Sequence, residues 1–272
     1  MIKVVKAGAR TSVQNLGRYG LGAQGVPRGG AMDLWALRAA NRLVGNDDGA
    51  AALEMTLAGP SLRFEADTVV AVVGARCDVA NDEAFSVPSG DVIEVGRLRD
   101  GARAMLAVRG GIEHRIGETL AIGDVMAVTT RGGAAPLKRL RAGALRRSTT
   151  MRAVALQDSA LFGAPWTLSA DANRAGLRLN GARLTGGEIE PIGIVPGVVQ
   201  VPPSGSPIVL GPDGPATGGY RAVACVIGAD VGLLAYPLPG ATITFEQVDV
   251  QEAHQAWHAA ERALAEGIED IA

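Results

Sequence analysis

Short apolar runs separated by glycine- and proline-rich turns dominate the first half of the chain. Their length and alternation are typical of half-buried β-strands. The pattern predicts strands over Ile2–Ala7, Ala52–Met55, Ser61–Phe64, Thr68–Val73, Val92–Val95, Ala104–Val108 and Asp124–Val128. Short strands at regular spacing, with turn signals between them, indicate a barrel or a sandwich.

The second half of the chain repeats this pattern. Strands are predicted over Arg152–Leu156, Leu177–Leu179, Glu188–Ile194, Val198–Val201, Pro207–Leu210, Arg221–Ile227, Gly232–Leu234 and Ala241–Val248. Pro202 and Pro203 cannot donate to a strand ladder, and Gly205 supplies the free φ of a turn between two of these strands. We therefore expect a mainly β fold of two β-barrel halves with a few short helices.

The apolar period changes to that of a helix in two places. The first predicted helix runs from Asp33 to Val44 and ends at Gly45-Asn46, a pair typical of a helix C-cap. The second runs from Val250 to Ala265, with a narrow apolar stripe and charges on the opposite side.

Glycine and proline are dense from Gly8 to Gly30, and interleaved apolar residues indicate an ordered, specifically shaped loop. The loop leads through Gly29 and Gly30 to Asp33 at the start of the predicted helix. Free N–H groups and the positive end of the helix dipole suit a carboxylate, bicarbonate or phosphate at this point. The alternative is that Asp33 only caps its own helix.

A second glycine-rich loop, Asp213 to Gly219, leads to Tyr220. The backbone at Gly218 and Gly219 can approach a ligand without interference from Cβ atoms, which is the geometry of an anion-binding concavity. The alternative is a hairpin followed by an ordinary surface loop.

Composition narrows the class of protein. With 272 residues, 47% of them apolar, the chain can bury a sizeable core. The formal net charge of −2 and the 4% aromatic content do not fit a nucleic-acid partner. The first residues lack the apolar segment of a signal peptide, and the apolar runs are too short to span a membrane. We expect a cytoplasmic protein without a membrane partner, whose Cys77 and Cys225 are buried thiols and not a disulfide.

A basic segment divides the chain. It holds Arg131, Lys138, Arg139, Arg141, Arg146, Arg147 and Arg152, and no acidic residue occurs between Asp124 and Asp158. It is either a solvated linker or a docking strip for an acidic partner surface. We place the domain boundary here, with an N-terminal half over 1–130, a basic linker over 131–152 and a C-terminal half with the terminal helix over 153–272.

Common catalytic motifs are missing from the sequence. His254 and His258 have the spacing of a metal pair, but residue 255 is Gln and no third ligand is indicated, so we predict no metal site. The sequence contains no Walker loop, no Rossmann fingerprint after a strand, no GxSxG elbow and no CxxC pair.

Several motifs in order resemble one family. They are Thr11-Ser12-Val13-Gln14-Asn15-Leu16-Gly17-Arg18, Gly25-Val26-Pro27, Gly30-Ala31-Met32-Asp33, Asn41 to Asn46, Leu53-Glu54, Gly197 to Pro203 and Thr217-Gly218-Gly219-Tyr220. Together they resemble the biotin-dependent carboxyltransferase or allophanate hydrolase subunit 2 family, which includes KipA and the C subunit of 5-oxoprolinase. The resemblance spans nearly the whole chain and implies cyclophilin-like β-barrels in both halves.

The resemblance also implies partners and cofactors. Members act with a subunit 1 or B-type (KipI-like) protein, and the 5-oxoprolinase members also with an A-like subunit. It implies no covalently bound cofactor in this chain, with carboxybiotin or ATP supplied through the partner subunits. The expected substrate is a small amide or lactam.

The chain departs from the family pattern at several positions. Asn15 replaces an Asp, Tyr236 replaces a Gln, and Pro191-Ile192-Gly193 stands where members tend to read Ser-Glu-Gly. The loop from Asp213 to Arg221 has lost polar residues, and the segment Glu113–Thr119 is shortened. Lost polar groups at a site mean lost hydrogen bonds to substrate or transition state. The chain is therefore either a divergent member with an altered substrate or one retained for assembly.

The motifs place the predicted site in a cleft lined by the Gly25–Asp33 loop and the Gln200–Tyr220 segment. The predicted catalytic residues are Asp33, Gln200, Thr217 and Tyr220, and the predicted substrate-binding residues are Arg28, Gly29, Gly30, Arg109, Gly218 and Gly219. Glycine N–H groups bind a carboxylate, and Arg28 or Arg109 balances its charge. Gln200 and Thr217 orient an amide, Tyr220 walls the pocket, and Asp33 is the acid–base candidate.

Three functions follow from this reasoning. The first is a subunit, inactive alone, of an ATP-dependent amide or lactam hydrolase of the 5-oxoprolinase type or of a biotin-dependent carboxyltransferase. The second is a non-catalytic regulatory protein of the KipA type. The third, prolyl isomerisation by a cyclophilin-like barrel, has weak support because a fold does not imply a function.

Overall fold

The computed structural model describes residues 1–129, 136–157 and 160–271. It confirms the predicted mainly β fold, and the described residues contain two α-helices. The chain divides into two compact units. The first comprises Met1–Leu16, Leu34–Leu145 and Ala263–Ala272, and the second comprises Gly17–Asp33 and Arg146–Arg262. Unlike the halves expected from the sequence, each unit is built from segments that are distant along the chain.

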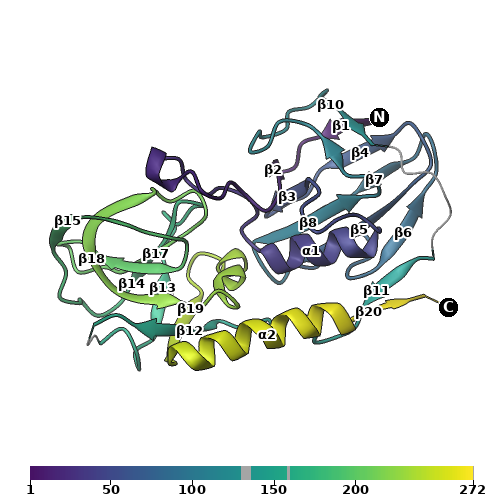
Figure 1. Cartoon of the computed structure of the whole chain (residues 1–272). Coiled ribbons are helices and arrows are strands. Elements are labelled where there is room, and N and C mark those ends of the chain that lie inside the picture. Colours follow the sequence, from purple (N-terminus) through teal and green to yellow (C-terminus); the bar gives the residue numbers. More distant parts are fainter. Residues whose placement is uncertain (130–135, 158–159, 272) are drawn as a thin grey trace. The chain divides into compact units, whose positions relative to one another are not determined.

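The first unit contains two five-stranded sheets among its described residues. One has the order β7-β4-β1-β10-β9 and the other the order β2-β3-β8-β5-β6. Their strands are β1 Ile2–Lys6, β2 Arg10–Gln14, β3 Ala52–Thr56, β4 Ser61–Phe64, β5 Thr68–Gly74, β6 Ala84–Val87, β7 Val92–Glu94, β8 Arg103–Val108, β9 Ile112–Glu113 and β10 Val125–Val128. Helix α1, Leu34–Leu43, lies along β5 and β8 on the second sheet (Figure 1).

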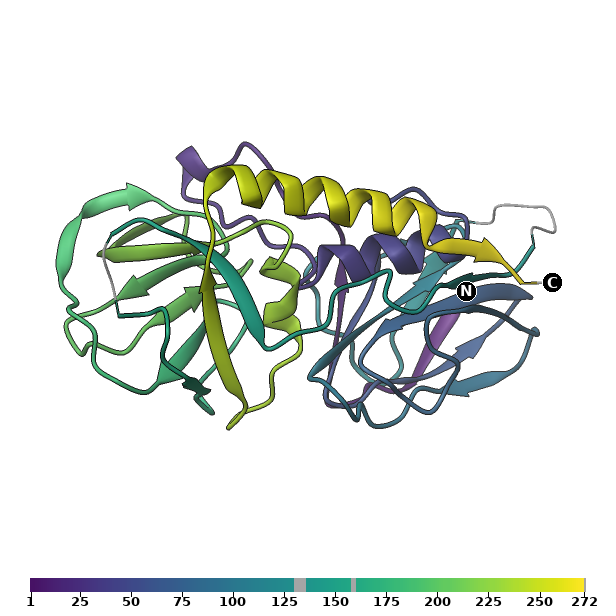
Figure 2. The same ribbon diagram turned by 90° about the horizontal axis from the view of Figure 1, so that it is seen from below.

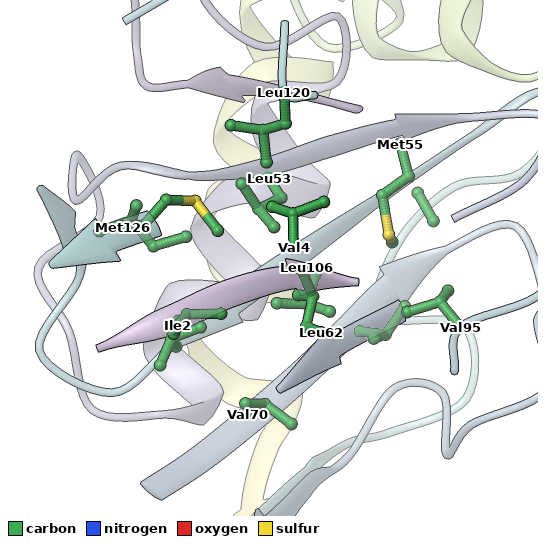
Figure 3. Packing of buried hydrophobic residues seen from close by; sticks show 14 of the residues in the cluster. Ile2, Val4, Leu53, Met55, Leu62, Val70, Val95, Leu106, Leu120 and Met126 are labelled. Atoms are coloured by element: carbon green, nitrogen blue, oxygen red, sulfur yellow. The ribbon is translucent and has the colours of Figure 1, made fainter. Parts of the chain in front are cut away.

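The core of the first unit lies between these sheets. Side chains from both sheets, among them Ile2, Val4, Leu62 and Leu106, point toward one another (Figure 3). Each of these four is at most 1% exposed. The alternation of apolar residues predicted this arrangement, because every second side chain of a strand faces the same side.

The second unit is built around a closed barrel. Its strands follow the order β12-β19-β13-β14-β17-β16-β18, and an additional β12–β18 pairing closes the ring. They are β12 Thr150–Ala155, β13 Trp166–Leu168, β14 Gly176–Asn180, β16 Val198–Val201, β17 Ile208–Leu210, β18 Thr217–Val226 and β19 Thr242–Gln247. Strand β15, Glu188–Gly193, pairs with β18 outside the ring, and all six of its residues are exposed. Figure 1 shows β15 at the outer edge of the barrel.

Helical segments complete the two units. Two short 3-10 helices, η1 Gly22–Gln24 and η2 Val231–Ala235, belong to the second unit. Helix α2, Val250–Glu266, is the long yellow helix of Figure 2. In the second unit its Ala256 packs against Ile227 and Ala229. In the first unit, β11 Lys138–Leu140 pairs with β20 Ile268–Asp270.

Three local predictions are wrong. Gly232–Leu234 is part of the 3-10 helix η2 and not a strand, because a three-residue apolar run does not distinguish the two. The predicted Gly8–Gly30 loop contains strand β2, which pairs with β3. Thr217, Gly218 and Gly219 begin strand β18 and do not end a loop, since β15 provides them with a pairing partner.

The described part of the basic segment is held by ion pairs within each unit. Arg139 and Arg141 contact Glu269 in the first unit. Arg146 and Arg152 contact Asp230 in the second, and the Asp230 side chain is fully buried. Arg131 lies outside the described residues. The four paired arginines therefore have intramolecular partners, and the described part of the segment includes β11 and the start of β12. Its role as a docking strip stays a prediction.

Candidate functional site

Five of the predicted site residues line one pocket in the second unit. Its volume is about 440 Å³, and its lining residues are Glu188, Ile189, Gln200, Pro215, Thr217, Gly218, Gly219 and Tyr220. They come from β15, β16, β18 and the turn before β18. The structure thus brings together Gln200, Thr217, Gly218, Gly219 and Tyr220, although their proposed roles remain predictions.

Gln200 is the most deeply buried polar side chain of this pocket, with 3% exposure. Its Nε2 donates to the carbonyl oxygen of Tyr220 at 3.1 Å. The β16–β18 register shifts between Val199 and Gln200, and such a bulge can redirect a side chain. A Cβ atom on Gly218 would lie 2.3 Å from the Gln200 Nε2. Gly218 therefore leaves the space that the Gln200 amide occupies.

Glu188 is a pocket residue that the sequence reasoning missed. It lies opposite Tyr220 in the β15–β18 pairing. The Tyr220 side chain is 39% exposed, so both a carboxylate and a phenol are available at the pocket. The signal in the sequence was weak, because Glu188 is an ordinary exposed residue of a predicted strand until the register of that strand is known.

The polar residues that line this pocket are suited to hydrogen bonding with a polar, uncharged group. Gln200, Thr217 and Tyr220 can each donate and accept, and Glu188 accepts when ionised. None of the described residues that line this pocket is a lysine or an arginine. A molecule with both N–H donors and a carbonyl acceptor fits this set better than an anion does.

The glycines of the N-terminal loop lie in the same unit but do not line the pocket. The N–H of Gly29 donates to the carbonyl oxygen of Pro212 at 2.8 Å. The carbonyl oxygen of Gly30 accepts from Arg174 Nη2 at 2.6 Å, and Arg174 also contacts Asp213. The predicted anion-binding N–H of Gly29 is therefore already used to attach the loop to the barrel.

Asp33 and Arg28 also have neighbours other than those expected. The Asp33 carboxylate is buried and accepts a hydrogen bond from the Tyr236 hydroxyl, with Gly232 of η2 beside it. Tyr236, a departure from the family pattern, thus supplies a donor to Asp33. The Arg28 guanidinium lies over the Tyr19 ring, 4.7 Å from its centroid. Neither Asp33 nor Arg28 lines the pocket.

Arg109 belongs to the first unit and lines a different pocket there. Its Nε donates to the carbonyl oxygen of Val44, at the end of α1, at 3.2 Å. Its predicted role beside the other site residues remains a prediction.

Metal and thiol chemistry have little support among the described residues. No group of three His, Cys, Asp or Glu residues with metal-binding geometry occurs there. Cys77 and Cys225 are free thiols, as predicted, but only Cys77 is buried and Cys225 is partly exposed. Burial raises the pKa of each. Within residues 1–129, 136–157 and 160–271, none of the helices has the length and apolar character needed to span a membrane.

Comparisons with known proteins agree with this architecture. The family model for the carboxyltransferase domain, subdomain A and B, matches residues 24–116 and 116–247. The chain is 36% identical to the C subunit of 5-oxoprolinase from Escherichia coli over 94% of both chains. Among solved structures, TTHA0988 is 32% identical with a TM-score of 0.83, over 90% of this chain and 55% of that one. The K. lactis urea amidolyase is 26% identical with a TM-score of 0.88, over 99% of this chain and 20% of that one.

The family match covers more than half of the chain, and the alignment with the E. coli protein extends over nearly all of both sequences. The two units described above are shared with solved structures at high TM-scores. The chain therefore belongs to the family of carboxyltransferase domains with subdomains A and B.

Proposed function

We propose that this protein is a subunit of a multi-subunit, ATP-dependent amide or lactam hydrolase of the 5-oxoprolinase type. The observation that carries the proposal is the 36% identity to the C subunit of E. coli 5-oxoprolinase over 94% of both chains. In this assignment the protein works in the cytoplasm with a subunit 1 or B-type partner and an A-like subunit. ATP acts through these partners.

The pocket beside β18 is the proposed substrate site of this protein. A lactam or amide presents one N–H donor and one carbonyl acceptor, and Gln200, Thr217 and Tyr220 offer both complements. Gln200 is already held by its hydrogen bond to the Tyr220 carbonyl, so its amide is oriented before a substrate arrives. Glu188 would accept from a substrate N–H at the same pocket.

Carboxyl transfer is the second candidate function. It is favoured by the family description and by the TM-score of 0.88 to the K. lactis urea amidolyase. This chain covers 20% of that protein, so its remaining parts would be separate subunits here. The same pocket would then hold the amide that accepts a carboxyl group, with carboxybiotin brought by a partner.

Reconstitution tests the first proposal. The chain would be co-expressed with a B-type protein of a 5-oxoprolinase, and ATP hydrolysis that depends on 5-oxoproline would be measured with and without the A-like subunit. We expect turnover only in the complete assembly. A complex that transfers a carboxyl group from carboxybiotin but does not open 5-oxoproline would support the second candidate instead.

Isosteric variants test the pocket within that assembly. Tyr220→Phe and Thr217→Val each remove one hydroxyl, and we expect each to lower kcat/KM at least tenfold because a hydrogen bond to the substrate is lost. Thr242→Val is a matched control in the same unit, outside the pocket, and should keep full activity. A stable complex without turnover on either substrate would favour the regulatory, KipA-type function.

A further inference from the structure

Strand pairing places three polar side chains of the pocket beside β18 on one face of the sheet. Glu188 lies opposite Tyr220 in the β15–β18 pairing, and Gln200 lies opposite Ala222 in the β16–β18 pairing. Directly opposed residues share a face, as do residues two apart along a strand, so Glu188, Gln200 and Tyr220 point to the same side. A Cβ atom on Gly218, two residues before Tyr220, would meet Gln200 Nε2, which agrees with this arrangement.

The polar groups of this pocket are open to a ligand. Glu188 and Thr217 are exposed, and Tyr220 is 39% exposed. Within the described part of the chain, the Glu188 carboxylate and the hydroxyls of Thr217 and Tyr220 have no hydrogen-bonding or ion-pairing partner. The bond from Gln200 to the Tyr220 carbonyl uses one of the two N–H donors of that amide. A ligand can therefore bind these groups without breaking a bond inside the protein.

The charge at this pocket is negative. Glu188 is the one charged residue among the described residues that line it. Two charged residues flank the lining in sequence: Glu190, which is exposed, and Arg221, which directly follows Tyr220. Successive side chains of a strand point to opposite faces, so Arg221 points away from the face of Tyr220, and its Nε donates to Gln157 Oε1 at 2.6 Å. None of the described lining residues offers a positive charge that would balance Glu188.

This charge distinguishes two classes of lactam. A lactam ring offers one N–H donor and one carbonyl acceptor, which the Glu188 carboxylate and the Tyr220 hydroxyl complement. A lactam that also carries a carboxylate brings a second negative charge beside Glu188. Two unit charges about 4–5 Å apart in water repel each other enough to weaken binding roughly fivefold. Because Glu188 is exposed, salt screens this repulsion.

We propose that Glu188 determines the substrate class of this pocket, which binds an uncharged lactam or amide in preference to one that carries a carboxylate. Glu188 accepts the substrate N–H and repels a carboxylate on the same molecule. The inference rests on the proposed function, because it takes the pocket beside β18 as the substrate site. It goes further by naming a substrate without a carboxylate, whereas 5-oxoproline, from which the E. coli relative is named, carries one.

Titration of the full chain with 2-pyrrolidinone and with 5-oxoproline tests this preference, because the two lactams differ by one carboxylate. Binding would be followed by NMR line broadening of the ligand protons. We expect 2-pyrrolidinone to bind roughly fivefold more tightly at about 10 mM salt, and the two affinities to converge at about 1 M salt. Equal affinities at low salt would overturn the proposal. No binding of either lactam would overturn the pocket as a substrate site of this chain.

Two variants of β15 test the role of Glu188. Glu188→Gln keeps an acceptor for the substrate N–H but removes the charge, so it should strengthen 5-oxoproline roughly fivefold and change 2-pyrrolidinone little. Glu190→Gln removes the same charge from the same strand outside the pocket lining and should retain the preference. Circular dichroism would verify that both variants are folded. An unchanged preference in folded Glu188→Gln would refute the role of this residue.

Binding and turnover separate this inference from the proposed function. A chain that prefers 2-pyrrolidinone, in an assembly that hydrolyses neither lactam with ATP, would refute the hydrolase and retain the selectivity of the pocket. An assembly that hydrolyses 5-oxoproline, built on a chain that binds both lactams equally, would retain the hydrolase and refute the selectivity.

Discussion

The glycine pair at the start of β18 gives a direct test of the pocket geometry. In Gly218→Ala the new Cβ would lie 2.3 Å from Gln200 Nε2 and 2.7 Å from Ile194 Cδ1. Both atoms end flexible side chains, so the side chains and not the backbone must move. In Gly219→Ala the nearest atom is the carbonyl oxygen of Ile189 at 3.5 Å, an ordinary contact.

The expected cost follows from the bond that Gln200 loses. Displacing its amide breaks the 3.1 Å hydrogen bond to Tyr220 and leaves buried polar groups unpaired, at about 1–3 kcal/mol. Replacing a strand glycine by alanine returns about 0.5–1 kcal/mol. We therefore expect Gly218→Ala to lower the free energy of unfolding by about 0–2.5 kcal/mol, with a midpoint of about 1 kcal/mol. Gly219→Ala should leave it unchanged or raise it by up to about 1 kcal/mol.

Urea denaturation followed by tryptophan fluorescence would measure both variants, since Trp166 is fully buried in the second unit. The two substitutions are identical in chemistry and adjacent in sequence, so each controls for the other. Equal stability of the two variants would refute the packing of Gln200 over Gly218. A Gly218→Ala variant that is more stable than the unmodified chain would do the same.

Three further outcomes are expected. Asp230→Asn removes the charge of a fully buried carboxylate that is bonded to Arg152, so it should lower the free energy of unfolding by about 3–5 kcal/mol. A loss below about 1 kcal/mol, measured by urea denaturation, would contradict this. The hydrogen bond from Arg42 lowers the pKa of Asp48 below its ordinary 3.8, so this carboxylate stabilises the fold above that pH and less as the pH falls through its folded pKa. Between pH 5 and pH 2 the unfolding free energy of Asp48→Asn should therefore fall less steeply than that of the unmodified chain, and parallel curves would count against the ion pair. Burial raises the pKa of Cys77 and Cys225, so a thiol reagent at about pH 8 should label the native chain much more slowly than the chain unfolded in urea. Equally fast labelling of the two forms would show that neither thiol is protected.

The strands of this fold were predictable where the residues of the strand itself show apolar alternation between turn residues. Ser61–Phe64 and Val198–Val201 begin and end where apolar alternation and flanking turn residues placed them. Strand β20 was missed, because its partner β11 lies more than a hundred residues earlier in the chain. The start of β18 was misjudged for a related reason: its glycines favour a loop until β15 pairs with them.

In the candidate site, too, local sequence motifs predicted some residues, whereas contacts between distant segments determine the others. Gln200 and the residues from Thr217 to Tyr220 were predicted from sequence as site residues, and they line one pocket. Glu188 was not found, because only the register of β15 brings it opposite Tyr220. The role of Gly29 as an anion donor was inferred from loop chemistry, but its N–H is bonded to Pro212, some 180 residues later, by a contact that no local pattern reveals.

The interleaved construction of the two units has a consequence for protein synthesis. The second unit includes residues 17–33. During synthesis, this early segment has no folded unit to join until the residues from Arg146 onward have been translated. The first unit obtains the strand that pairs with β11 only when β20, the last described element, emerges. Neither unit can therefore finish folding before nearly the whole chain has been translated, and no single cut in the sequence would release either one intact.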